Sequence, residues 1–102
     1  MINEASAAAQ TAAKIAARTA LVGVIGLGYV GLPLAAATAR AGFSTIGFDV
    51  DTDKLARFNA GYSYIDAVPP EELAGHVASG CLRATGDFAE LADCDVIVIC
   101  VP

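Results

Sequence analysis

Short apolar runs alternate with longer mixed segments along this chain, and the two kinds of segment predict different elements. Apolar runs of the type found in buried parallel sheets predict four strands, at 21–25, 44–49, 82–85 and 95–101. Mixed segments with helix breakers at their ends predict helices at 29–40, between Asp51 and Gly61, between Pro69 and Gly80, and a helical turn after Asp87. Because strands and helices alternate, we predict an α/β fold: a Rossmann-type, doubly wound parallel sheet, truncated to about four strands with flanking helices.

The apolar pattern also predicts what each element buries. Inward-facing side chains are predicted at Val30, Leu34, Ala37 and Ala41 in the first helix, Leu55 and Phe58 in the second, and Leu73 and Val77 in the third. Asp87 and Glu90 have the spacing of a capping box at the start of the last helical turn. The final run, 95–101, is apolar after its first residue and predicts a fully buried central strand.

The chain divides into an alanine-rich leader, residues 1–20, and a globular part, residues 21–102. The leader has few large apolar side chains to bury, so we expect it to be helical or disordered. Since the chain stops at Pro102, directly after a buried strand, we expect it to be the first part of a larger domain. The last strand would then lack a partner on its outer edge, which predicts self-association through 95–101.

Composition excludes several classes of function. The chain has 102 residues, 56% of them hydrophobic and 17% charged, which is typical of a folded domain rather than a disordered one. Its net charge of −5 provides no basic patch for nucleic acid and no attraction to an anionic membrane surface. The uncharged stretch from Thr19 to Ala39 has the length of a membrane span, but its glycines and Pro33 make it a poor continuous helix.

The cysteines and the single histidine predict no reactive centre. Cys81, Cys94 and Cys100 are an odd set without a Cys-x-x-Cys pair, which argues against disulfides and zinc and favours free thiols in a reducing cytoplasm. We interpret His76 as a surface helix residue, Cys100 as an inert core thiol and the other two cysteines as structural. Tyr62 and Tyr64 are expected to pack over their loop, with contact to a ligand as the alternative. No nucleophile, base and oxyanion donor occur together, so no catalytic and no metal-binding residue is predicted.

The strongest chemical signal is Gly26-x-Gly28-x-x-Gly31, between the first predicted strand and the first predicted helix. Gly26 permits the tight turn, Gly28 leaves room for a pyrophosphate, and Gly31 lets the helix pack on the strand. The pyrophosphate would accept hydrogen bonds from N–H groups at the helix N-terminus. The alternative is an ordinary turn in a Gly/Ala-rich core. The predicted dinucleotide-binding turn consists of Gly26, Leu27, Gly28, Tyr29, Val30 and Gly31.

Asp49 ends the second predicted strand, 21 residues after Gly28, at the spacing expected for the acid that binds the adenosine ribose. Its carboxylate would accept hydrogen bonds from the ribose hydroxyls and repel a 2′-phosphate by about 1–4 kcal/mol at about 4 Å. No arginine follows immediately to bind that phosphate, so NAD is favoured over NADP. The alternative role for Asp49 is a helix cap, and Asp51, Asp53 and Lys54 also suit a solvated helix start.

Several stretches resemble the nucleotide-sugar (UDP-glucose/GDP-mannose) dehydrogenase family, and within it the branch that oxidises UDP-N-acetylglucosamine. They are K-I-A-A-R-T-A, V-G-V-I-G-L-G-Y-V-G-L-P-L-A, G-F-D-V-D, G-Y-S-Y-I, L-R-A-T-G-D-F and D-V-I-V-I-C-V-P. They fall between Lys14 and Pro102 and correspond to the cofactor half of a longer enzyme. The pattern G-Y-V-G-L-P, with S-Y-I and C-V-P, separates the chain from hydroxyisobutyrate- and phosphogluconate-type dehydrogenases.

This resemblance implies an activity. Members of the family oxidise C6 of a UDP-sugar to the uronic acid with two NAD in succession, and this branch uses a UDP-N-acetylhexosamine. The resemblance also implies that Lys54 helps bind the adenosine end and that Val101 and Pro102 begin a segment on the nicotinamide side. The family's catalytic residues lie downstream, so we expect this chain to lack them. The alternative is a non-catalytic nucleotide-sensing module built on the same β-α-β unit.

Overall fold

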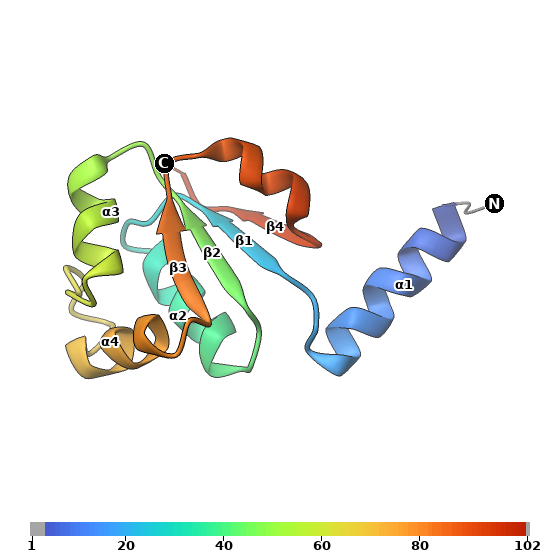
Figure 1. Cartoon of the computed structure of the whole chain (residues 1–102), viewed down its shortest axis with the longest axis horizontal. Helices are drawn as coiled ribbons and strands as arrows, with labels where there is room; N and C mark the ends of the chain where they lie inside the picture. The colour runs from blue at the N-terminus through green and yellow to red at the C-terminus, as the bar shows by residue number, and fades with distance from the viewer. Residues whose placement is uncertain (1–3, 102) are drawn as a thin grey trace.

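In the computed structural model, which describes residues 4–101, the chain folds around one parallel sheet (Figure 1). The strands are β1 (Val22–Ile25), β2 (Thr45–Phe48), β3 (Leu82–Thr85) and β4 (Val96–Ile99). Their order across the sheet is β3-β2-β1-β4, and all the pairs are parallel. This arrangement confirms the predicted Rossmann-type class, in which the chain returns to the far side of β1 after β3.

The helices are α1 (Glu4–Ala17), α2 (Gly31–Arg40), α3 (Thr52–Asn59) and α4 (Pro70–Ala78), and a 3₁₀ helix, η1 (Phe88–Asp93), precedes β4. α2, α3 and α4 pack on one face of the sheet. η1 lies on the opposite face, where the ring of Phe88 contacts the ring of Phe48 from β2. α1 projects away from the sheet (Figure 1), and its Lys14 forms an ion pair of 2.9 Å with Asp95.

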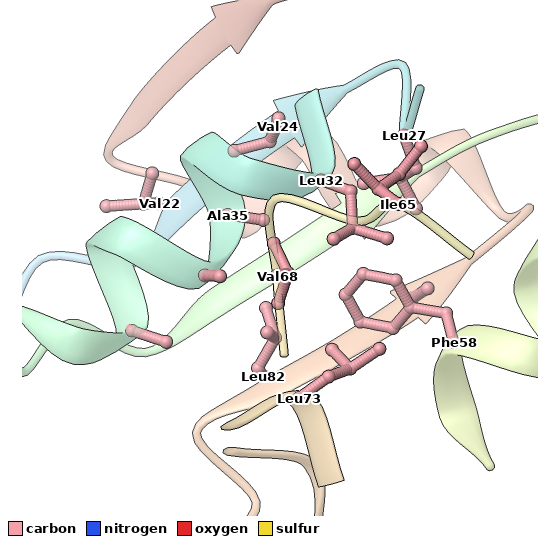
Figure 2. Close-up of a cluster of buried hydrophobic side chains, with 13 residues drawn as sticks. Val22, Val24, Leu27, Leu32, Ala35, Phe58, Ile65, Val68, Leu73 and Leu82 are labelled. Carbon is pink, nitrogen blue, oxygen red and sulfur yellow. The ribbon is translucent and has the colours of Figure 1, made fainter. Parts of the chain in front are cut away.

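The core fills the space between the sheet and the three helices that cover it. Figure 2 shows Phe58 from α3, Leu73 from α4 and Leu82 from β3 close together, and all three side chains are fully buried. Leu55 and Val77 are half-buried and pack against the same cluster. The inward faces predicted for α3 and α4 are therefore confirmed.

The buried face predicted for α2 is wrong. Val30 precedes the helix and is 66% exposed, Ala41 is exposed, and Leu34 and Ala37 are only half-buried. The buried residues of the helix are instead Gly31, Leu32, Ala35, Ala36 and Ala39. Alanines occur on several faces of this helix, so the sequence shows little difference in hydrophobicity between the faces. Packing selects the face that carries Leu32, which fits between the sheet and the loop after α3.

The prediction of a fully buried central strand at 95–101 is also wrong. The strand is shorter, pairs with β1 alone and forms one edge of the sheet in the described residues. Val96 and Val98 are half-buried on the helix-covered face, whereas Ile97 and Ile99 are 46% and 67% exposed. A strand that is apolar on both faces is predicted to be buried on both, but here only the face of β4 that carries Val96 reaches the core cluster.

The capping box predicted before β4 forms only in part. Asp87 accepts a hydrogen bond from the N–H of Ala89 at 3.1 Å, as a cap does. Glu90 does not reach back to Asp87, because it forms an ion pair of 2.6 Å with Arg83. The N–H of Asp87 donates instead to Oγ1 of Thr85 at 3.1 Å.

Candidate functional site

An open cleft of about 670 Å³ lies where β1, β2 and β4 end. Its walls are the turn after β1, the segment 48–50 that follows β2, and the segment 99–101 that follows β4, with Phe88 from η1 and Lys54 from α3. Ligands of doubly wound sheets bind at this position, outside the carboxyl ends of the strands, where the chain order reverses. The cleft is therefore the candidate site, and it contains most of the residues that the sequence singled out.

The three glycines of the turn are constrained in three different ways. Gly26 has a φ of +93°, which favours glycine, and a Cβ there would lie 2.7 Å from the carbonyl oxygen of Cys100. A Cβ at Gly31 would overlap the carbonyl oxygen of Gly26. A Cβ at Gly28 would meet no described atom within 4 Å. Two glycines are thus required by the protein's own packing, while the space above Gly28 opens into the cleft.

Leu27 is held in place by both its backbone and its side chain. The side chain is fully buried and occupies a notch in β2, where a Cβ on Gly47 would lie 2.7 Å from Leu27 Cδ2. The N–H of Leu27 donates to Oδ2 of Asp49 at 2.9 Å, and its carbonyl oxygen accepts from the hydroxyl of Tyr64 at 2.7 Å. Residues from two other segments therefore fix the turn.

The Asp49 carboxylate lines the cleft and is held by backbone amides. Its Oδ1 accepts from the N–H of Asp51 at 3.0 Å, in addition to the bond between Oδ2 and Leu27. Partial burial raises the pKa of Asp49, but the amides of Asp51 and Leu27 and the charge of Lys54 outweigh it and lower the pKa below the ordinary value. Asp49 is therefore an anion at neutral pH, with its oxygens still able to accept further hydrogen bonds.

The N-terminus of α2 differs from those of α3 and α4. No side chain caps α2, whose N-cap residue is Val30, and its first turn contains no acidic residue. α3 has a cap, Asp51, with Asp53 in its first turn, and α4 has two glutamates there. The positive end of α2 therefore has no anionic side chain of its own, and it points toward the cleft.

The cleft is also where large apolar side chains are exposed. Six of its residues are exposed large hydrophobics: Tyr29, Val30, Val50, Phe88, Ile99 and Val101. Of these, Val50, Phe88 and Ile99 were not predicted as site residues. A signal was available for two of them, because Val50 lies just beyond the carboxyl end of one predicted parallel strand and Ile99 lies near the carboxyl end of another. Phe88 lies in η1, far along the sequence from the turn and from Asp49, and no sequence pattern indicated that it would reach the cleft.

The structure brings together most of the predicted cofactor-binding residues. Gly26, Leu27, Gly28, Tyr29, Val30, Asp49, Lys54 and Val101 all line the one cleft. Gly31 lies beneath the turn, against Gly26, and does not line it. Pro102 lies outside the described residues. The cofactor role of each of these residues stays a prediction.

Two interpretations of single residues hold only in part. His76 lies on α4 as expected but is half-buried, because α4 packs beside α2 and leaves the imidazole 18% exposed, with Nε2 3.1 Å from Oε2 of Glu72. Cys100 follows the last residue of β4 and is half-buried: it packs against the core cluster, as expected, but it also lines the cleft. Tyr64 does not only cover its own loop, since its hydroxyl reaches the turn.

Two further searches of residues 4–101 gave negative results. No three His, Cys, Asp or Glu side chains in this part of the chain are placed to hold a metal ion. None of the helices described there combines the length and the apolar character needed to cross a bilayer.

The parallel sheet, with the glycine turn and the cleft at the carboxyl ends of its strands, is an arrangement of the Rossmann type. Comparison with known proteins identifies its family. Residues 20–102 match the NAD binding domain of the UDP-glucose/GDP-mannose dehydrogenase family. The chain belongs to this family, and NAD is the cofactor of its domain, as the sequence predicted.

Relatives of known name are dehydrogenases of different sugar nucleotides. The chain is 32% identical over 83 residues to UDP-N-acetyl-D-mannosamine dehydrogenase of Pyrococcus horikoshii, covering 78% of this chain and 19% of that protein. It is 40% identical over 82 residues to GDP-mannose 6-dehydrogenase of Pseudomonas putida, again covering 78% and 19%. A crystal structure of a ternary complex of GDP-mannose dehydrogenase from Pseudomonas aeruginosa superposes with a TM-score of 0.73 at 34% identity, over 79% of this chain and 19% of that one. The chain thus spans about a fifth of the length of these relatives.

Proposed function

We propose that the cleft holds NAD for a UDP-sugar 6-dehydrogenase that oxidises C6 of a UDP-N-acetylhexosamine to the uronic acid, with two NAD in succession. The family and the likeness to a UDP-N-acetyl-D-mannosamine dehydrogenase support this reaction. In this proposal the chain supplies cofactor binding, and the residues that act on the sugar belong to the rest of the whole protein. The named relatives are dehydrogenases, which favours an enzyme over a nucleotide-sensing module. Free thiols support a cytoplasmic location.

The turn and α2 would bind the pyrophosphate. The uncapped N-terminus of α2 supplies N–H donors and a positive dipole end, without an acidic side chain to compete with the anion. The open space at Gly28 lets the phosphates approach the backbone, whereas the strictly packed Gly26 and Gly31 hold the turn in its shape. Packing and access are thus divided among the three glycines in the way that a phosphate turn needs.

Asp49 would bind the adenosine ribose and select NAD. This is the observation that carries the proposal, because the carboxylate is anionic, faces the cleft and is fixed from behind by two backbone amides. Each of its oxygens uses one lone pair on an amide and keeps another for a ribose hydroxyl. A 2′-phosphate at the same place would meet that negative charge. Lys54, on the same wall, would contact the adenosine end.

The apolar side chains would contact the flat rings of the dinucleotide. Val50 and Phe88 lie on the wall beside Asp49, and Tyr29, Ile99 and Val101 lie on the other walls. An adenine or nicotinamide ring that covers these side chains removes apolar surface from water. In this proposal Val101 and the following Pro102 lie on the nicotinamide side.

Calorimetric titration of the 102-residue chain with NAD and with NADP tests this assignment. We expect tighter binding of NAD, by at least about fivefold, which is the lower end of a repulsion of about 1–4 kcal/mol. Asp49→Asn removes the charge and keeps an oxygen that accepts from Leu27, so it should narrow the preference while the fold persists. Asp53→Ala is the matched control, since Asp53 lies in the same helix start without lining the cleft.

Equal affinities of the wild-type chain for the two dinucleotides would contradict the role of Asp49. A folded chain that binds neither dinucleotide, even at millimolar concentration, would contradict the site as a whole. Circular dichroism of each variant shows whether it is folded.

A further inference from the structure

A second cluster of reactive side chains lies away from the cleft, where α4 approaches the start of β3. Glu72 and His76 are one helical turn apart on α4, and Nε2 of His76 lies 3.1 Å from Oε2 of Glu72. Arg40, the last residue of α2, holds the same carboxylate oxygen at 2.6 Å. Cys81 precedes β3, and its Sγ lies 3.9 Å from the other imidazole nitrogen, Nδ1. The Ser79 hydroxyl lies 3.1 Å from this sulfur and 3.0 Å from the carbonyl oxygen of His76, and its single hydrogen can go to either. The sulfur lies 3.4 Å from the same carbonyl oxygen, which competes with Nδ1 for the thiol hydrogen.

This order of groups is suited to removing the proton from a thiol. A ring nitrogen that faces a carboxylate carries the hydrogen, so the lone pair of His76 is on Nδ1, which faces the sulfur. Glu72 fixes the orientation of the ring and stabilises the imidazolium that forms when it takes a proton. His76 also lies in the last turn of α4, where the negative end of the helix dipole favours a cation. Once the thiol proton has left, the Ser79 hydroxyl can turn its hydrogen from the His76 carbonyl to the sulfur and stabilise the negative charge there.

The other two cysteines have no such base near them in the described residues. Burial, and then the carboxylates of Asp93 and Asp95, raise the pKa of Cys94, which keeps its thiol protonated. Cys100 lines the apolar cleft. All three thiols are half-buried, so exposure does not distinguish them. They differ in the chemical groups around the sulfur.

We propose that Cys81 is a modification site, at which His76 assists attack of the sulfur on small electrophiles and hydroperoxides. With an alkyl halide, the S–C bond forms, the halide leaves, and the thiol proton passes to Nδ1 of His76. With a hydroperoxide, the sulfur attacks one peroxide oxygen and the O–O bond breaks. Sulfur is oxidised to the sulfenic acid, and the leaving oxygen takes the thiol proton and is reduced to water or an alcohol. The site is independent of the dinucleotide cleft.

Alkylation kinetics with iodoacetamide, followed by peptide mass spectrometry on the full 102-residue chain, test the proposal. One reaction mixture gives a rate for each of the three cysteines, so Cys94 and Cys100 serve as internal controls. We expect Cys81 to react about tenfold faster than either, or more, since a positioned base contributes a factor of this order or above. In urea the three rates should converge, because unfolding separates Cys81 from His76.

His76→Gln is the informative variant. The amide nitrogen of glutamine can keep the hydrogen bond to Glu72, but no base remains opposite Cys81. The rate at Cys81 should fall to that of Cys100, while the other two rates stay unchanged. Labelling with hydrogen peroxide and a sulfenic-acid probe should give the same order of reactivity.

Three equal rates in the folded wild-type chain would overturn the proposal, and they need no variant to be measured. A folded His76→Gln chain with an unchanged rate at Cys81 would overturn the role of His76. If this variant does not fold, Ser79→Ala provides a second measurement. The proposal predicts a smaller loss of rate, at Cys81 alone, and an unchanged rate at Cys81 would contradict it.

Discussion

At each end of the sheet an aspartate accepts a hydrogen bond from a backbone N–H beside β1, but the two aspartates have different surroundings. At the amino end, Asp95 precedes β4 and accepts a hydrogen bond from the N–H of Leu21 at 2.9 Å. At the carboxyl end, Asp49 follows β2 and accepts from the N–H of Leu27 at the same distance. At the amino end Lys14 pairs with the remaining oxygen of Asp95. At the carboxyl end no lysine or arginine of the described chain forms an ion pair with Asp49.

The comparison separates a structural aspartate from a candidate ligand. Both carboxylates tie a backbone N–H beside β1 to a neighbouring strand, so this bond alone does not indicate function. The difference lies in what surrounds them: a paired cation at the amino end, and a cleft with exposed apolar side chains at the carboxyl end. The Asp49 carboxylate keeps free lone pairs that face a cleft with exposed apolar side chains, and this points to the carboxyl end as the site.

The largest expected effect distinguishes Gly31 from Gly28, two glycines of the turn at the carboxyl end of the sheet. Gly31→Val should disrupt the native turn, because even a Cβ would overlap the carbonyl oxygen of Gly26, and we expect a loss of roughly 3 kcal/mol or more in the free energy of unfolding. Gly28→Val should change stability by no more than about 0.5 kcal/mol, yet abolish NAD binding. Thermal unfolding followed by circular dichroism, beside calorimetric titration, measures both.

Wild-type melting of the Gly31 variant would show that the turn relaxes more easily than its packing indicates. Retained NAD binding by folded Gly28→Val would show that the phosphates do not pass over this residue.

A smaller effect, on stability, is expected from Asp95 at the amino end of the sheet. The N–H of Leu21, and then Lys14, lower the pKa of Asp95 below its ordinary value of 3.8. A carboxyl group whose pKa is lower in the folded state stabilises the fold above the unfolded pKa, and this contribution disappears as the pH falls through the folded value. Asp95→Asn should therefore reduce stability at pH 7 and lessen its loss below about pH 4. Urea unfolding over this pH range measures the change.

Asp95→Asn should leave the preference for NAD over NADP unaltered, whereas Asp49→Asn should alter it. A change of cofactor preference in the Asp95 variant would mean that the two ends are not independent.

The smallest effect concerns the outer edge of β4, which the sequence predicts to self-associate. Sedimentation velocity of the chain should show weak, concentration-dependent association, and Ile97→Lys should reduce it, because a lysine on an edge strand opposes pairing with another chain. Ile15→Lys is the matched control, since Ile15 on α1 is 45% exposed and Ile97 is 46% exposed. NAD should leave the association unchanged if it involves the edge, and weaken it if the cleft is involved. A monomer at all concentrations, with slowly exchanging β4 amides, would contradict the prediction.

The sequence was sufficient for the order of elements and for most of the cleft. Strand bounds are close to those predicted, and β3 is the same, because the apolar runs are short and end at clear breakers. The turn and Asp49 meet as expected because parallel strands end at one edge of a sheet. These features depend on local pattern and topology, which a single sequence contains.

The features that sequence reasoning missed depend on contacts between distant segments. Whether a strand that is apolar on both sides is central or at an edge depends on what covers it, so β4 was misjudged. The ion pairs of Glu90 with Arg83 and of Glu72 with Arg40 join separate elements. They leave no periodic signal in the sequence. The contact of Tyr64 with the turn also depends on the fold of a whole loop.

The three attachments of Leu27 have a consequence for the thermodynamics of binding. Its side chain, its N–H and its carbonyl oxygen are each held by a different part of the fold. A loop that must become ordered when its ligand arrives loses conformational entropy, and this loss is subtracted from the affinity. Here the ordering of the turn is part of folding, so the dinucleotide meets a surface whose shape is already set.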